Sequence, residues 1–168
     1  MKRTVVAFVI IGILGSVWHF FYDWTGENYF VGLFAPVNES TWEHLKLLFW
    51  PVLLYFGIEH FFFSDKRHSN FLPALALGIF SGMLVIVSSF YTYSGILGYT
   101  VDFINILTYF IGLAVLLTVK TLVTKNRIFT SKTAKIISAV LLLAFAVFSF
   151  IWSYNPPSLG IFTPPVNQ

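Results

Sequence analysis

The sequence predicts an all-α fold, a bundle of five transmembrane helices that forms a single membrane domain over residues 1–168. Apolar residues make up 57% of the chain and charged residues only 10%, whereas soluble domains carry about 25% charged residues. Five apolar stretches reach the length of roughly 20 residues that a helix needs to cross a bilayer. They cover residues 4–23, 41–63, 71–93, 99–123 and 135–154.

The basic residues predict the orientation of these helices. Nine of the ten lysines and arginines lie before the first stretch, between the second and third, or around the connection of the fourth and fifth. Only Lys46 lies at the opposite end. By the positive-inside rule, the N-terminus is expected in the cytoplasm and the C-terminus outside. Five acidic residues then fall at the outer side: Asp23, Glu27, Glu39, Glu43 and Asp102.

The first stretch, residues 4–23, follows Lys2 and Arg3 and could be read as a secretory signal. No small-x-small cleavage site stands out in it, so we expect it to be retained as the first spanning helix. Its small and polar residues recur at intervals of three and four and therefore share one helical face. They are Gly12, Gly15, Ser16, His19, Tyr22 and Asp23.

The second stretch, residues 41–63, opens with the densest group of ionisable residues in the chain. Ser40 and Glu43 fit a capping box, in which each side chain bonds to the backbone N–H of the other residue. Lys46 follows Glu43 by one turn and is expected to be its ion-pair partner, while Glu39 can complement the helix dipole. Glu39, Glu43 and Lys46 share a face, and His44 projects about 100° away.

The later stretches carry weaker polar faces. In the third, Gly78 and Gly82 favour close packing against another helix. In the fourth, Asp102 is expected to cap the helix, with Asn105 and Tyr109 below it. The fifth, residues 135–154, has a weaker face of this kind, with Ser138, Ser149 and Ser153. Together these faces predict a polar cavity that opens outward and is lined by the first, second and fourth helices.

Two segments outside the stretches have a distinctive composition. Residues 24–37 include several apolar side chains, so this external segment is expected to lie in the membrane interface or to fold back over the bundle. The tail, residues 155–168, contains two proline pairs and is expected to be extended, because proline lacks the N–H that a helix needs.

The motifs around the charged segment resemble those of an uncharacterised family of small bacterial multi-pass membrane proteins. The resemblance is based on His19-Phe20-x-Tyr22, on Asn38-Glu39-Ser40-x-Trp42-Glu43-His44-x-Lys46, on Pro51 and on Pro156-Pro157. It covers most of the chain and implies a multi-pass membrane protein of the bacterial inner (plasma) membrane, without implying an activity. The chain differs from membrane hydrolases that hold zinc with a late His-x-x-x-His pair, since no histidine follows His68.

Ionisable groups within a membrane are costly and commonly functional, so the outer polar group is the candidate site. Its expected lining residues are His19, Tyr22, Asp23, Asn38, Glu39, Glu43, His44, Lys46, Asp102 and Asn105. The function ranked first is binding or transport of a small polar or cationic ligand. In that interpretation Glu39 and Glu43 bind the ligand and Lys46 tunes their charge.

Two alternatives stay open. One is a metal-dependent membrane hydrolase of a lipid-like substrate, in which His19 and His44 hold a divalent ion such as zinc. The third ligand would be Glu39, Asp23 or Asp102. Glu43 would then be the general base. The other is a structural partner subunit without chemistry of its own, in which the polar groups specify helix packing.

The expected partners follow from the same composition. The lipid bilayer surrounds the helices, and a homodimer would supply the symmetry that many transporters obtain from internal repeats. The basic residues reflect membrane topology, so we expect no nucleic-acid partner. The chain has no cysteine, which excludes disulfides, thiolate ligands and cysteine nucleophiles.

Overall fold

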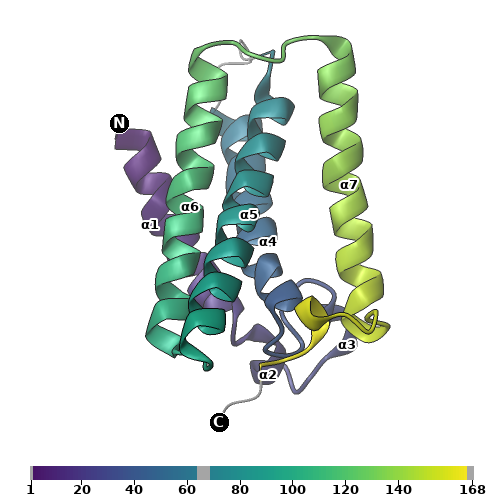
Figure 1. Ribbon diagram of the computed structural model, residues 1–168. Helices are drawn as coiled ribbons and strands as arrows, with labels where there is room; N and C mark the ends of the chain where they lie inside the picture. The colour runs from purple at the N-terminus through teal and green to yellow at the C-terminus, as the bar shows by residue number, and fades with distance from the viewer. Residues whose placement is uncertain (1, 64–68, 166–168) are drawn as a thin grey trace.

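The computed structural model describes residues 2–63 and 69–165, and these residues form helices joined by short connections (Figure 1). The long helices are α1 (Lys2–Trp18), α4 (Thr41–Ile58), α5 (Phe71–Leu97), α6 (Asp102–Lys125) and α7 (Lys132–Tyr154). The short ones are α2 (Phe21–Trp24), α3 (Tyr29–Gly32), the π-helical turn η1 (Glu59–Phe63) and the 3₁₀ turn η2 (Gly160–Phe162). The expectation of an all-helical chain is confirmed for the described residues.

Four of these helices are long and apolar enough to cross a membrane: α4 with its π-helical turn, α5, α6 and α7. α1 is shorter, with 17 residues, and the prediction that it continues to Asp23 is wrong. The α-helical pattern ends where the Phe20 N–H donates to the carbonyl of Val17 at 3.1 Å, three residues back instead of four. His19 therefore stands at the exit of the helix. Five spans and the orientation of the termini stay predictions.

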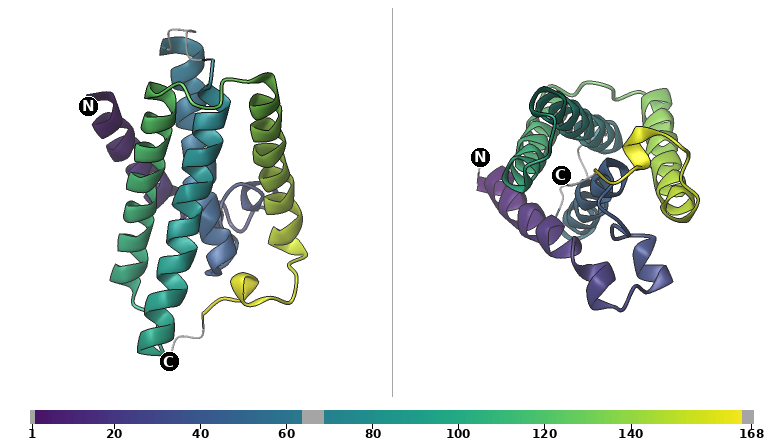
Figure 2. Two further views of the ribbon diagram at one scale, coloured as in Figure 1. Left: turned by 45° about the horizontal axis from the view of Figure 1, so that its top comes forward. Right: turned by 60° about the horizontal axis from the view of Figure 1, so that its bottom comes forward.

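The helices are arranged around α4 (Figure 2). α5 and α6 form the closest pair, α1 packs against α4 and α6, and α7 packs mainly against α5. Glycines permit the tight approach of α5 to α6. A Cβ atom at Gly82 would lie 2.7 Å from the carbonyl oxygen of Gly112, and one at Gly78 would lie 2.8 Å from that of Leu116. The predicted small-residue face of α5 is therefore its interface with α6.

The contact between Gly82 and Gly112 leads to a first testable prediction. Gly82→Ala is expected to lower the free energy of unfolding by about 1–3 kcal/mol, because the new methyl group meets backbone that cannot move alone. Gly95→Ala in the same helix is the matched control, since a Cβ there meets nothing within 4 Å. Denaturant titration of both variants in detergent micelles measures the difference. Equal stabilities would contradict the packing described here.

The segment before α4 and the C-terminal tail both fold back onto the helices. The Tyr154 hydroxyl donates to the carbonyl of Tyr29 at 2.9 Å, which attaches α3 to the end of α7. The expectation of an extended tail is wrong for residues 155–165. The η2 turn buries Phe162 against Trp42, with ring centroids 5.0 Å apart. Burial of this aromatic ring accounts for the folded tail.

Candidate metal centre

Three potential metal ligands converge near the end of the bundle where α1 ends and α4 begins. His19 Nε2 lies 3.3 Å from His44 Nε2. The Glu39 Oε2 atom lies 3.6 Å from His19 Nε2 and 3.4 Å from His44 Nε2. The two imidazoles are each 30% exposed and the Glu39 side chain is 65% exposed. The structure therefore brings together the two predicted histidine ligands and Glu39, one of the three acids considered as the third ligand.

The hydrogen bond on the far side of the His44 ring determines which nitrogen faces this cluster. His44 Nδ1 lies 2.9 Å from the carbonyl oxygen of Ser40. A carbonyl only accepts hydrogen bonds, so Nδ1 carries the hydrogen and the neutral ring presents the Nε2 lone pair to the cluster. Metal-binding histidines are commonly oriented by such a bond to a backbone carbonyl. In this tautomer the Nε2 atom of His44 could accept a cation.

The Glu39 carboxylate adds a second acceptor. The hydrogen bond with His19 contributes most to holding the pKa of the Glu39 carboxyl far below its usual range, so it is ionised at neutral pH. A carboxylate and an unprotonated imidazole nitrogen both accept hydrogen bonds. A single N–H on His19 Nε2 can point at one of these acceptors. A cation between the three atoms would satisfy all of them at once.

The spacing of the three atoms can be compared with known metal geometry. Zinc binds histidine nitrogens and carboxylate oxygens at about 2.0–2.2 Å, in tetrahedral sites. Ligand atoms in such a tetrahedron are about 3.3–3.6 Å apart. The three separations here, 3.3, 3.4 and 3.6 Å, match that edge length. A zinc ion held by three protein ligands would keep a fourth position open, as in catalytic zinc sites.

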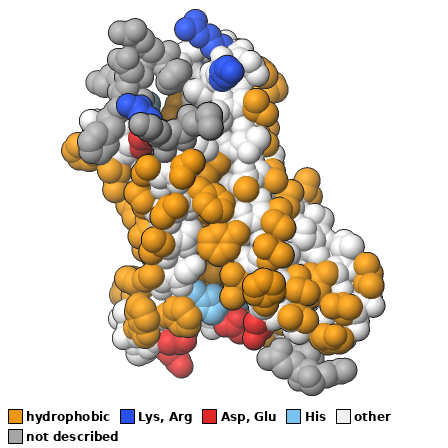
Figure 3. Space-filling view, turned by 90° about the vertical axis from the view of Figure 1, so that its left-hand side faces the viewer, with side chains coloured by type: hydrophobic (Ala, Val, Ile, Leu, Met, Phe, Trp, Pro, Cys, Tyr) orange, Lys and Arg blue, Asp and Glu red, His pale blue; other side chains and the backbone are white. Residues whose placement is uncertain are grey.

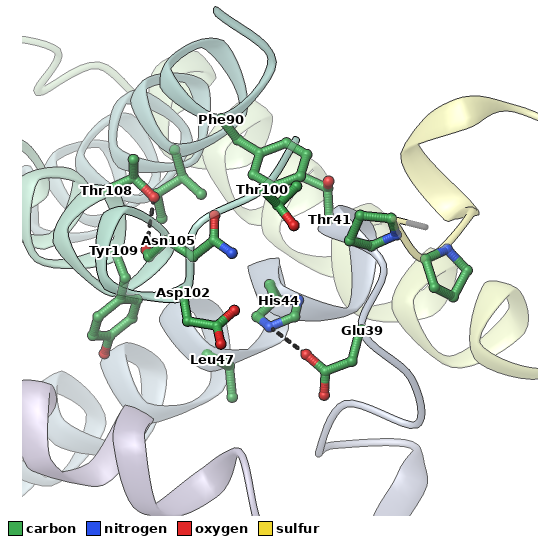
Figure 4. A pocket seen from close by; sticks show the side chains of 13 residues that line it. Glu39, Thr41, His44, Leu47, Phe90, Thr100, Asp102, Asn105, Thr108 and Tyr109 are labelled. Atoms are coloured by element: carbon green, nitrogen blue, oxygen red, sulfur yellow. Dashed lines mark hydrogen bonds and ion pairs between the residues drawn. The ribbon is translucent and has the colours of Figure 1, made fainter. Parts of the chain in front are cut away.

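A pocket of about 350 Å³ lies beside this cluster. Figure 4 shows the His44 ring, the Asp102 carboxylate and the Asn105 amide pointing into it. Its walls come from the start of α4, from α5, from α6 and from the tail. The lining residues are Glu39, Thr41, His44, Leu47, Ile86, Phe90, Thr100, Asp102, Asn105, Thr108, Tyr109, Pro164 and Pro165.

The predicted cavity between the first, second and fourth helices is thus only partly correct. α4 and α6 line it as expected, but α1 contributes none of its described lining residues. The reason is a direct contact between helices. The Tyr109 hydroxyl donates to the carbonyl of Ile11 at 3.2 Å, which closes α1 against α6. α5 and the tail take the place of α1 in the wall.

The sequence model of a family of unknown function, DUF6512, matches residues 1–168. The chain belongs to this family. The match confirms the expectation of an uncharacterised family and says nothing of its activity. No curated protein and no solved structure matches the chain.

Glu43 and Lys46 of this DUF6512 protein form a second polar group, away from the pocket. The Lys46 Nζ atom lies 2.8 Å from Glu43 Oε2, and the two side chains are 0% and 2% exposed. Lys46 also donates to the carbonyl of Gly32 at 2.8 Å and to the Ser153 hydroxyl. The expected ion pair is confirmed. The pair does not share a site with Glu39, which turns instead toward His44.

The capping box at the start of α4 is half formed. The Ser40 hydroxyl accepts from Glu43 N–H at 3.4 Å, as expected. The Ser40 N–H, however, donates to the Asn38 side chain at 2.9 Å. Glu43 Oε2 instead accepts from the Val37 N–H at 2.9 Å. Asn38 therefore replaces Glu43 as the acceptor in the box and lines no part of the described pocket wall.

The other predicted site residues have mixed positions. Asp102 is the first residue of α6 and makes no capping bond, since Val101 holds the N-cap position; its side chain is free to enter the pocket. Asn105 lines the pocket and accepts from the Tyr93 hydroxyl.

Asp23 is exposed at the end of α2. The hydrogen bond to Glu39 contributes most to raising the pKa of His19, and the negative charge of Asp23 adds to it. Tyr22 packs near Gly32 and is absent from the pocket lining.

Several lining residues were not predicted from the sequence. Thr108 follows Asp102 and Asn105 at intervals of three, so its position on the polar face of α6 could have been inferred. Thr100 and Pro164 lie outside helices, and no periodic pattern indicates their place in the pocket wall.

Proposed function

We propose that this protein is a metal-dependent membrane hydrolase. Its divalent ion, zinc in the first instance, would be held by His19 Nε2, Glu39 Oε2 and His44 Nε2. The observation that carries the proposal is the triangle of 3.3, 3.4 and 3.6 Å between these atoms. The positive-inside rule would place the site at the external face of a bacterial inner membrane.

The residues around the triangle suit hydrolysis. A zinc ion with three protein ligands polarises a carbonyl group and makes water acidic enough to react near neutral pH. Asp102 points into the same pocket and is the candidate general base, in place of Glu43, whose carboxylate is buried. The apolar side chains of Leu47, Ile86 and Phe90 line the pocket and suit a lipid-like substrate.

The layer beneath the cluster favours this function over transport. A cation crossing the bundle would need polar groups along its path, because the membrane interior gives no solvation. The core positions of α1 and α4 that follow are instead apolar and fully buried. They include Ile11, Leu48, Phe49 and Val52, each 0% exposed. Binding at the outer end alone, without passage, fits this arrangement.

Metal analysis of the purified protein tests the proposal. After equilibration with zinc and removal of the excess, we expect elemental mass spectrometry to find one zinc ion per chain. His19→Ala and His44→Ala should each abolish stoichiometric binding, because two remaining ligands hold zinc poorly. His60→Ala is the matched control, since His60 lies in η1, where its ring stacks on Phe71 of α5, away from the triangle.

Folding of each variant is checked by thermal melting in the same detergent. A wild-type protein that holds no zinc, or ligand variants that hold as much as His60→Ala, would overturn the proposal. A stoichiometric metal without any hydrolytic activity would support cation binding as the function.

A further inference from the structure

We infer that the site takes an amphipathic ester or amide whose polar part is uncharged or cationic, and that it discriminates against phosphate-bearing and other anionic groups. This inference rests on the proposed metal-dependent hydrolysis and names its substrate class. It is carried by the distribution of charge around the pocket.

The end of the molecule that carries the pocket has exposed acids and no exposed base among the residues that the structure describes. Asp23, Glu27, Glu39 and Asp102 are exposed there. Its one described basic residue, Lys46, is fully buried and paired with Glu43. Figure 3 shows the contrast on one face, with lysine and arginine toward one end and acids beside a histidine toward the other.

Proteins recognise phosphate groups with arginine forks, lysine charges or the free N–H groups of a helix N-terminus. The described pocket lining contains neither lysine nor arginine. The N-terminus of α6 borders the pocket, but its first residue is Asp102, whose negative charge already complements the helix dipole. An anionic group would therefore meet a carboxylate where a phosphate site offers a donor.

The proposed ion does not reverse this balance. A divalent cation brings two positive charges, and the carboxylates of Glu39 and Asp102 together bring two negative ones. The pocket with its ion is therefore close to neutral, and the remaining acids at this end, Asp23 and Glu27, add a negative field. Such a site attracts a cationic group and accepts a neutral one.

The rest of the lining defines the shape of the substrate. Leu47, Ile86 and Phe90 offer an apolar wall for an acyl or alkyl chain. Thr100, Asn105 and Thr108 offer uncharged hydrogen-bonding groups for the polar part. In hydrolysis the oxygen of water bonds to the carbonyl carbon and Asp102 takes its proton. The carbon–oxygen or carbon–nitrogen bond then breaks, and the alcohol or amine leaves with that proton.

Three octanoyl hydroxamates test the charge preference with the same metal-binding group. They carry hydrogen, trimethylammonium or phosphonate on the carbon next to the hydroxamate. Isothermal titration of the zinc-loaded protein in uncharged detergent should give the ammonium compound an affinity equal to or above that of the neutral one. The phosphonate should bind at least tenfold more weakly than the neutral compound.

Two lysine variants distinguish the effect of charge in the pocket from the effect of charge elsewhere at the same end of the molecule. Thr100→Lys adds a cation to the pocket wall and should improve phosphonate binding at least fivefold. Thr25→Lys adds the same charge to an exposed position after α2, outside the described lining, and should change it less than twofold.

The outcomes distinguish this inference from the proposed function. If the protein binds zinc and the neutral hydroxamate but prefers the phosphonate, the charge inference is wrong and the metal site stands. If the protein binds no zinc, both are wrong. An equal response of the two lysine variants would also count against the pocket as the origin of the preference.

Discussion

Lys46→Met is expected to lower the free energy of unfolding by about 3–5 kcal/mol, because it leaves the carboxylate of Glu43 buried without its partner. The Glu43 side chain is only 2% exposed, so water cannot replace the lost ammonium group. The carbonyls of Gly32 and Ala35 lose a donor as well. Chemical denaturation in mixed micelles, followed by tryptophan fluorescence, measures the loss.

Two comparisons make this expectation specific. Lys125→Met removes an exposed lysine at the end of α6 and is expected to change stability by less than about 0.5 kcal/mol. The double variant Glu43→Leu/Lys46→Met removes both charges and should be more stable than Lys46→Met alone, since no unpaired ion is left. If Lys46→Met were no worse than Lys125→Met, the buried pair would have no structural role.

This buried network also bears on the metal centre. Glu43 accepts from the N–H of Val37, two residues before Glu39. Lys46 holds the carbonyls of Gly32 and Ala35 in the same segment, and the Ser153 hydroxyl of α7 donates to Glu43 at 3.2 Å. The ion pair thus attaches the segment that carries Glu39 to two long helices. A weaker zinc affinity in Lys46→Met would follow from this attachment, without any contact between Lys46 and the metal.

The sequence predicted those features that depend on helical periodicity. Intervals of three and four residues placed Asp102 and Asn105 on one face of α6, and one turn of α4 placed Lys46 beside Glu43. Glu39 shows the limit of this reasoning. It precedes α4, so its direction depends on the turn in which Asn38 accepts from the Ser40 N–H. Extending the helical pattern back to Glu39 put it on the face of Glu43, whereas the turn directs it to His44.

The tail shows a second limit. Proline pairs correctly excluded a long helix in residues 155–165, but they carry no information on where the tail folds and packs. Its path depends on Phe162, which finds Trp42 and Trp152 within about 5 Å between ring centroids. Contacts between residues far apart in the chain, such as Phe162 and Trp42, leave no periodic trace in a single sequence. The same holds for Tyr109, whose bond to Ile11 excludes α1 from the pocket wall.

Asp102→Asn is expected to reduce kcat for a neutral ester such as p-nitrophenyl octanoate by about 10²–10⁴-fold, the usual contribution of a general base. The asparagine amide has nearly the same shape and can still lie at the start of α6, but it cannot take the proton of the attacking water. Asp102 is not one of the three ligands in the triangle, so the zinc content should stay at one per chain. Initial rates and metal analysis on the same preparation measure both quantities.

Asp23→Asn supplies the matched control, because it removes an exposed acid from the same end of the molecule and does not line the described pocket. Its kcat should stay within about twofold of wild type, since a general base acts only within hydrogen-bond reach of the proton it takes. Similar losses in both variants would indicate that the field of the acidic end, and not a base at Asp102, supports the reaction. Full activity in Asp102→Asn with zinc still bound would remove Asp102 from the mechanism and leave the metal to activate water without a protein base.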